Sequence, residues 1–423
     1  MRKNKFYQSV KFILIDNYFW YLTIDAIILL VSAKSYLGTL VTPFMLYYLA
    51  IKSKIHYSNI LINSLIILIW VSVILSWVIN TYDYQGILAV RYIWSDLSFM
   101  MAYYIGCSMS QSQYHRFFDN MMIPVALLSI LGLIFFIHPP GWYIERAITD
   151  DGASLESLRL KSVFPSPYTL SYISSVLLTY IFFQIVQNKK TFKEYRWFIL
   201  IMIITVLLCM QRAPMGGVVI GIIGALYYGI FIKKKYVLLY KSVFGGFIIT
   251  IMTIFLFSKL DTDMIQFLSY KIATVTSKDN DFLDSRYNIS YMEVQESMLG
   301  HGAGRYAAWA HKYHSYNMAD GQYKKISQEQ GYFGEFLYVS LFLLVVLKCL
   351  SFRKELSFEL CVMTFLMLSM IGANPFSNSG IHSMVWWLII GRVSSYKPNN
   401  KRSNSEQQNE KNINTVTQFT LPS

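Results

Sequence analysis

Charged residues are scarce in this chain of 423 residues: Asp, Glu, Lys and Arg together make up 14% of it, whereas hydrophobic residues make up 54%. A soluble globular domain carries roughly 25% charged residues, so the composition excludes an ordinary soluble protein. Many apolar runs reach the roughly 20 residues that a membrane-spanning helix needs. We therefore expect an all-α polytopic membrane protein.

Cysteine is also scarce, and the polar segments contain none. The four cysteines all fall inside apolar runs: Cys107, Cys209, Cys349 and Cys361. This placement excludes a disulfide framework and disfavours a thiolate metal site, so we expect no metal and no cofactor. A small-residue cleavage site is missing after the first apolar run. We therefore interpret the basic N-terminal segment as leading into a retained helix rather than as a signal peptide.

The apolar runs predict about twelve transmembrane helices. We place them at residues 19–34, 36–51, 59–79, 86–109, 119–138, 168–186, 197–211, 213–232, 237–258, 331–350, 357–373 and 380–396. Four regions follow from this assignment. They are an N-terminal transmembrane bundle at 1–258 with an outer loop at 139–167, a large and partly helical loop at 259–330, C-terminal transmembrane helices at 331–396, and a disordered tail at 397–423.

The net charge of +13 has two interpretations. A basic balance can indicate nucleic acid, but Lys and Arg also accumulate in the cytoplasmic loops of membrane proteins. The short segments on the side of the N-terminus carry most of the Lys and Arg, which favours the topological interpretation. We therefore expect both termini in the cytoplasm, the loop 259–330 outside, and no nucleic-acid partner.

Arginines gather on the predicted outer side. An outer-face enzyme has no ATP or nucleotide sugar to draw upon, so a lipid-diphosphate sugar is the natural carrier of energy. A guanidinium group binds phosphate oxygens in a bidentate fork. The candidate diphosphate-binding residues are Arg91, Arg159, Arg212, Arg286 and Arg305. The alternatives are an interfacial snorkelling residue for Arg212 and a buried pair with Asp96 for Arg91.

Glycines are spaced regularly in LGHGAGRY, residues 299–306. Gly300, Gly302 and Gly304 do not follow a predicted βαβ strand, so a nucleotide-binding fingerprint is disfavoured. A sharp turn that brings backbone N–H groups or Arg305 to a phosphate remains open, as does a plain loop turn.

The predicted entry into the membrane, DGQYKKISQEQGYFG at residues 320–334, combines two carboxylates with two glycines. Asp320 and Glu329 are candidate site residues, or the charges of a solvated amphipathic helix. Gly331 and Gly334 cost helix stability and suggest a close helix contact. Upstream, the spacing of three histidines matches no zinc pattern, and a catalytic, a sugar-binding or a merely solvated role stays open for them: His301, His311 and His314.

These motifs, in this order, resemble the superfamily of O-antigen ligases and Wzy-type polysaccharide polymerases. The loop motif of that superfamily is similar to SRYNISYMEVQESMLGHGAGRY, and its E-x-G-x-x-G motif matches Glu329, Gly331 and Gly334. Its outer helix end is similar to Gln211-Arg212-Ala213, and its Arg-to-Phe-Pro segment is similar to residues 159–165. Ligases typically carry His-Asn where this chain has Asp320-Gly321, which favours the polymerase branch.

The resemblance implies an inverting, metal-independent glycosyl transfer on the outer face of a bacterial cytoplasmic (inner) membrane. The donor would be an oligosaccharide on undecaprenyl diphosphate, and the acceptor another repeat unit of O-antigen or capsule. The arginines would neutralise the diphosphate, Asp320 or His314 would accept the acceptor's proton, and Glu329 would belong to the catalytic group. A chain-length regulator and a flippase would be partners. Other candidates are a ligase, a secondary transporter and a scaffold subunit.

Overall fold

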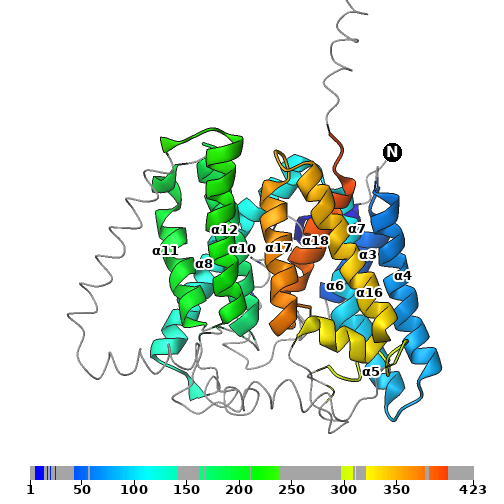
Figure 1. Cartoon of the computed structure of the whole chain (residues 1–423). Coiled ribbons are helices and arrows are strands. Elements are labelled where there is room, and N and C mark those ends of the chain that lie inside the picture. Colours follow the sequence, from blue (N-terminus) through cyan, green and yellow to red (C-terminus); the bar gives the residue numbers. More distant parts are fainter. Residues whose placement is uncertain are drawn as a thin grey trace, which may run out of the picture.

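The computed structural model describes residues 5–13, 17, 20, 24, 42–55, 58–141, 160, 162, 164, 167–189, 191–209, 211–237, 297–307, 310, 321–376 and 381–398. Regular structure in these residues is entirely helical (Figure 1). The elements are α1 (Lys5–Lys11), α3 (Thr42–Lys52), α4 (Ile60–Ile79), α5 (Gln85–Tyr92), η3 (Ile93–Leu97), α6 (Ser98–Met100), α7 (Ala102–Ser108), α8 (Gln111–Ile137), α10 (Pro167–Val186), α11 (Phe192–Leu208), α12 (Arg212–Tyr227), η5 (Tyr228–Ile232), α16 (Gln322–Ser351), α17 (Ser357–Gly372) and α18 (Ile381–Ser395).

Among the described residues, five helices are long and apolar enough to cross a membrane: α4, α8, α10, α12 with its continuation η5, and α16. Large apolar side chains are exposed on the outer faces of α4 and α16, such as Ile60, Val78 and Phe336. Such a surface is costly in water and suits a hydrocarbon environment. The chain thus has the character of a multi-pass membrane protein.

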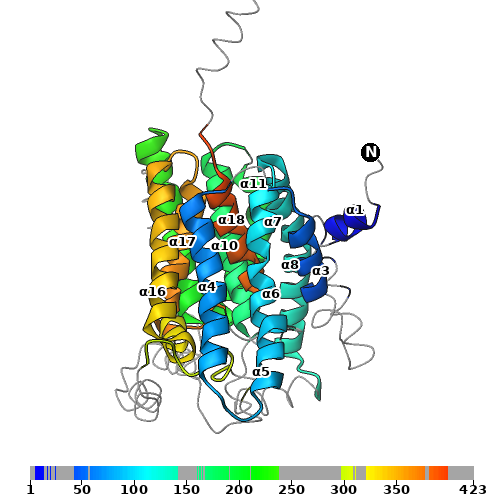
Figure 2. The same ribbon diagram turned by 90° about the vertical axis from the view of Figure 1, so that its right-hand side faces the viewer.

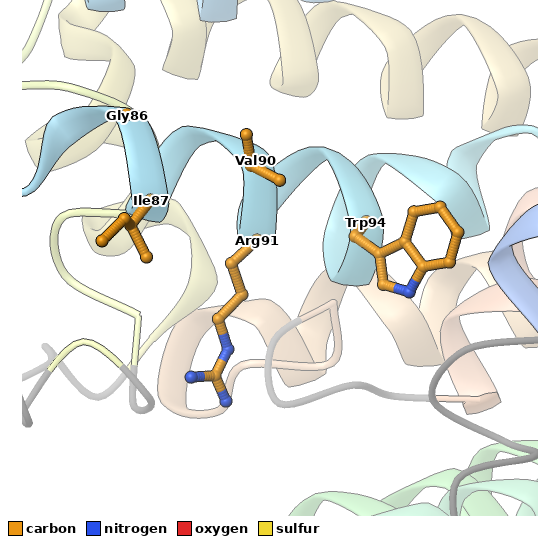
Figure 3. A pocket seen from close by; sticks show the side chains of 5 residues that line it. All are labelled: Gly86, Ile87, Val90, Arg91 and Trp94. Carbon is orange, nitrogen blue, oxygen red and sulfur yellow. The ribbon is translucent and has the colours of Figure 1, made fainter.

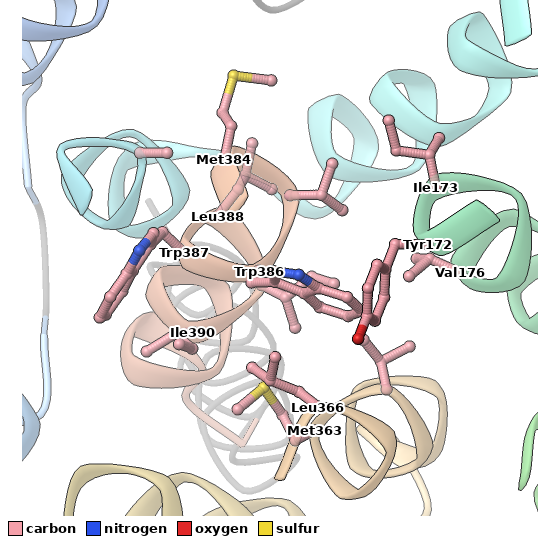
Figure 4. Packing of buried hydrophobic residues seen from close by; sticks show 14 of the residues in the cluster. Tyr172, Ile173, Val176, Met363, Leu366, Met384, Trp386, Trp387, Leu388 and Ile390 are labelled. Carbon is pink, nitrogen blue, oxygen red and sulfur yellow. The ribbon is translucent and has the colours of Figure 1, made fainter. Parts of the chain in front are cut away.

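The centre of the bundle is formed by α10 and α18, whose side chains are buried almost without interruption. Figure 4 shows Trp386 of α18 packed against Tyr172 of α10 and beside Met363 and Leu366 of α17. The two aromatic rings meet edge to face at 5.9 Å, a favoured arrangement of the ring quadrupoles. Helices that are apolar on all sides are expected at the core of a large bundle.

Close contact between α7 and α18 depends on small residues from both helices. A Cβ atom at Gly106 would collide with the backbone of Leu388, and one at Gly391 would collide with the backbone of Tyr103. Small residues let two membrane helices approach until their backbones touch.

The bundle has two ends (Figures 1 and 2). At one end α4 finishes, α5 begins, and α16 begins; we call it the loop end. At the other end α1 lies, α16 passes into α17, and α18 finishes; we call it the termini end. The described part of the predicted outer loop, residues 297–307, lies at the loop end.

Three helices begin earlier than their apolar runs predict. Helix α8 begins at Gln111 because Ser110 and Gln113 form a reciprocal capping box, with bonds of 3.1 and 3.3 Å. Helix α11 begins at Phe192, where Glu194 accepts a 3.0 Å bond from the Thr191 N–H. These first turns are polar, so hydropathy alone did not reveal them. The third is α16, which starts at Gln322 rather than at residue 331.

Other predicted boundaries are confirmed within a few residues for α4, α10, α17 and α18. The predicted helices at 19–34 and 237–258 lie almost entirely outside the described residues, and so does the tail from residue 399 onward. The total of about twelve spans therefore stays a prediction.

Candidate functional site

The site is built around a break in α16. Gly331 has φ 73° and ψ −175°, so the helical path stops there and resumes one residue later. A break of this kind leaves backbone groups without their helical partners. The break lies within the segment 320–334, which the sequence analysis predicted as the membrane entry. It divides α16 into a short helical segment before Gly331 and a long one after it.

A segment that we call the glycine turn, residues 297–307, supplies the missing partners. The Tyr332 and Phe333 N–H groups donate to the Ser297 and Met298 carbonyls at 3.2 and 3.1 Å. In return, the His301 and Gly302 N–H groups donate to the Gln328 and Glu329 carbonyls at 2.9 and 3.1 Å. The glycine turn and the break therefore stabilise each other.

Glycine is required in the turn for both conformation and space. Gly300, Gly302 and Gly304 have φ of 70°, 109° and 85°, a region that disfavours residues with a Cβ atom. A Cβ atom at Gly300 would overlap the backbone of Glu329 and Gln330, and one at Gly331 would overlap Met298. Residues 299–306 therefore form a turn, which both sequence-based alternatives have in common, and phosphate contact there stays a prediction.

The last turn of α4 holds the glycine turn from the other side. The Trp77 indole N–H donates to the Ala303 carbonyl at 2.7 Å, and the Ala303 N–H donates to the Ser76 hydroxyl at 3.1 Å. The Asn80 amide donates to the Gly300 carbonyl at 2.9 Å. Three polar side chains at one helix end therefore fix the path of this loop.

Glu329 lies on α16 beneath the turn and is enclosed, with 1% of its side chain exposed. Its Oε1 accepts a 3.3 Å bond from the Tyr306 N–H and lies 3.8 Å from Nζ of Lys325, which is 2% exposed. A buried ion pair in which one partner is lost leaves an uncompensated charge, so both residues are needed together. In this geometry Glu329 holds the turn, and a direct part in catalysis stays a prediction.

A second set of polar side chains connects α16 to α4 and α5. The Ser72 hydroxyl donates to Gln330 Oε1 at 2.8 Å, and the Gln330 amide lies 3.4 Å from the Tyr92 hydroxyl. Gly334 makes room for this arrangement because a Cβ atom there would collide with the Gln330 side chain. Among the described residues, Gly331 and Gly334 therefore do not make the close contact with a neighbouring helix that the sequence suggested: Gly331 makes room for the glycine turn, and Gly334 makes room for Gln330 of the same helix.

Asp96 lies one turn beyond Tyr92, in the π-helical segment η3. Both its carboxylate oxygens are shielded from solvent, and neither meets a hydrogen-bond partner among the described residues. Lys325 and Arg91 are close enough to attract this carboxylate electrostatically. Arg91 and Asp96, considered as a pair in the sequence analysis, interact electrostatically, and no hydrogen bond to the Asp96 carboxylate is formed among the described residues. Short π-helical turns inside α-helices occur often at functional sites.

Arg91 is exposed and extends away from α5, beside a shallow depression formed by Gly86, Ile87, Val90 and Trp94 (Figure 3). Arg305 is half-buried in the glycine turn, with its guanidinium 5.1 Å from the centre of the Tyr82 ring. Burial raises the pKa of the Tyr82 phenol, so this ring stays neutral and offers Arg305 a cation–π contact rather than an ion pair.

Arg212 lies elsewhere at the loop end. It is exposed at the first position of α12, which packs on α10 and α17, whereas the glycine turn packs on α4 and α5. Of the five candidate arginines, Arg305 thus lies in the glycine turn, and Arg91 lies on α5, which contacts that turn. The other four predicted site residues lie outside the described residues: Arg159, Arg286, His314 and Asp320.

Several residues of the site were missed by the sequence reasoning. The clearest is Lys325, which stands four residues before Glu329 and so shares its helix face, a signal that K-x-x-x-E could have supplied. Asn80 and Gln330 carry no comparable local signal because their partners are far away in the chain. Among the described residues, no group of three His, Cys, Asp or Glu side chains is arranged to hold a metal ion.

Comparisons of the chain with protein-family models, with curated proteins and with solved structures found no match.

Proposed function

We propose that this chain is a membrane glycosyltransferase that polymerises lipid-diphosphate-linked oligosaccharide units. One observation carries the proposal: the glycine turn carries Arg305 at the loop end, and the enclosed Glu329 fixes this turn by accepting the Tyr306 N–H. The turn packs on α5, which carries the exposed Arg91. An arginine without a binding role would not require a loop that is fixed by so many hydrogen bonds. A rigid support of this kind is what a site needs to orient a charged leaving group.

In the proposed reaction, a hydroxyl oxygen of the acceptor sugar attacks the anomeric carbon of the donor. The bond from that carbon to the diphosphate breaks, and the anomeric configuration inverts. Arg305 and Arg91, together with Arg159, Arg212 and Arg286, would stabilise the charge that develops on the lipid diphosphate. Asp320 or His314 would accept the acceptor's proton.

The proposed location is a bacterial cytoplasmic membrane, with the loop end outside and both termini in the cytoplasm. The acceptor would be the terminal sugar of a second lipid-linked unit, in O-antigen, capsule or a related polysaccharide. A ligase would use the same donor and the same arginines but a different acceptor. A flippase would supply the donor, and a chain-length regulator would limit the product.

One specific observation favours a second candidate, a secondary transporter. Transporters place charged groups within the membrane beside interrupted helices. Here α16 is interrupted at Gly331, and the shielded carboxylate of Asp96 lies within electrostatic range of Lys325. The same features serve a rigid enzyme site, and the exposed arginines favour the enzyme.

The test is the size distribution of surface glycan in host cells that lack this protein. We expect single repeat units on the final acceptor, and recovery of polymer with the intact chain. Full-length polymer that stays on the lipid carrier would indicate a ligase, and an unchanged profile would overturn both enzyme assignments.

Arg305→Gln supplies the residue-level arm of this experiment. We expect it to restore no polymer although the protein is present in the membrane. The matched control is Arg353→Gln, which removes the same charge from an exposed position at the termini end. Normal polymer with Arg305→Gln would remove the arginine from the proposed site.

A further inference from the structure

A cavity of about 570 Å³ opens at the termini end, between α8, α10, α17 and α18. Its wall is polar and aromatic, in contrast to the apolar outer faces of the helices. It shares no residue with the glycine turn or with the Lys325–Glu329 pair. Whatever occupies it therefore acts at a separate place.

Cations surround this cavity. They come from three different parts of the chain: Lys189, Lys354, Arg392 and Lys397. Two carboxylates, Glu355 and Glu359, also line it, so the cavity has a net positive charge. Such a lining attracts an anion.

Arg392 is held in place by aromatic faces. Its guanidinium carbon lies 5.8 Å from the centre of the Tyr114 ring and 5.9 Å from that of the Tyr396 ring. Both rings line the same cavity. Aromatic contacts orient a guanidinium while its N–H groups remain able to bind phosphate oxygens.

Polar atoms on the inner wall lack partners. Glu359 is 6% exposed and Tyr114 is 1% exposed. The Glu359 and Tyr114 side chains face each other, and Arg392 attracts the carboxylate. The Glu359 Oε2, the Tyr114 hydroxyl and the His115 Nδ1 are nevertheless buried without a hydrogen bond of regular geometry among the described residues. Leaving such groups unsatisfied is costly, and bound hydroxyl groups would satisfy them.

The cations and the buried polar atoms of the cavity together favour one kind of ligand. The cations match a phosphate, whereas a carboxylate and a phenol beside them match hydroxyl groups that donate and accept hydrogen bonds. Gln184 and Gln187 add amides that can both donate to and accept from hydroxyl groups.

We propose that this termini-end cavity binds an organic phosphate that carries hydroxyl groups. The chemistry is shared by a phosphoglycerol lipid headgroup and by a soluble sugar phosphate. The inference does not depend on the proposed glycosyl transfer, because the two sites lie at opposite ends of the bundle.

The test uses the full chain, purified in detergent, with two probes. Glucose 1-phosphate is titrated by calorimetry, and retained phosphatidylglycerol is counted by native mass spectrometry after exposure to phosphatidylglycerol nanodiscs. Binding of the first probe alone identifies a soluble ligand, and binding of the second alone identifies a lipid. Absence of both in the intact chain overturns the proposal.

Variants locate the binding. We expect Arg392→Gln and Glu359→Gln each to weaken binding about tenfold or more, the usual effect of losing a charge-assisted hydrogen bond. Arg353→Gln is the control, since it removes an exposed charge at the same end outside the cavity. Should a variant fail to fold, Lys354→Gln replaces it because that side chain is exposed. Equal binding by Arg392→Gln and Arg353→Gln would place the ligand elsewhere.

Discussion

The two ends of the bundle treat a buried glutamate in opposite ways. At the loop end, Glu329 is paired with Lys325 and accepts a backbone N–H. At the termini end, Glu359 lines a cavity and its Oε2 has no hydrogen-bond partner among the described residues. The first carboxylate stabilises the structure around it. The second is poised to bind something that the polypeptide does not supply.

The difference between Glu329 and Glu359 suggests two roles for a buried carboxylate: one stabilises the surrounding structure, and the other binds a ligand. A satisfied buried charge rigidifies its surroundings, whereas an unsatisfied one costs stability and is retained where function needs it. In the proposed function, the loop end binds its ligand through Arg91 and Arg305, beside the paired Glu329 and the unpartnered carboxylate of Asp96. In the proposed termini-end site, the binding groups lie inside the cavity.

The largest effect is expected from breaking the satisfied pair. Glu329→Gln leaves Lys325 charged and without its carboxylate, which lowers the free energy of unfolding by about 3–5 kcal/mol. Thermal unfolding of the purified protein measures this loss. Glu335→Gln, four residues beyond the break and half-buried, is the control and should change little. Equal stability of the two variants would contradict the supporting role of the pair.

The next effect concerns the break itself. Gly331→Ala places a Cβ atom at φ 73° against the backbone of Met298, which lowers the free energy of unfolding by about 1–3 kcal/mol. Gly216→Ala, in α12 with open space around it, is the matched control. It should raise stability by up to about 1 kcal/mol through helix propensity. A stable, fully active Gly331→Ala variant would show that the break is dispensable.

A substitution of Arg305 in the glycine turn is expected to affect activity more than stability. Arg305→Lys keeps the charge but loses the planar fork that binds two phosphate oxygens, so polymer yield should fall about tenfold while unfolding is nearly unchanged. The amount of polymer on a gel and thermal unfolding in detergent measure the two quantities. A parallel loss of polymer and of stability would show that Arg305 stabilises the glycine turn instead.

The smallest effect has the opposite sign. Glu359→Gln removes an unsatisfied buried carboxylate, so the free energy of unfolding should rise by about 0.5–2 kcal/mol. The measurement is thermal unfolding without added phosphate compounds. A destabilised variant would show that Glu359 is satisfied as Glu329 is, and the contrast between the two ends would disappear.

Local patterns in the sequence determined the helical class and the membrane character, and they placed the boundaries of α4, α10, α17 and α18 within a few residues. They also located the glycine turn and Gly331, because glycines at close spacing mark unusual backbone wherever they occur. The early start of α8 and of α11 could be predicted as well, since Ser110-x-x-Gln113 and Thr191-x-x-Glu194 are capping boxes. These features depend on neighbours within a few residues.

Only the tertiary structure decided what these features do. Asn80 and Gly300 are 220 positions apart, and Ser72 and Gln330 are 258 apart, yet both pairs are hydrogen bonded. Lys325 is a local partner of Glu329, four residues away, but the second partner, the Tyr306 N–H, comes from the glycine turn. Whether a buried glutamate finds all its partners therefore depends in part on distant residues. The sequence alone determines where glycines allow an unusual backbone conformation and which segments are apolar enough to contact lipid. The packing of α4, α5 and α16 decides which charges are satisfied, because burial and pairing are properties of the assembled bundle.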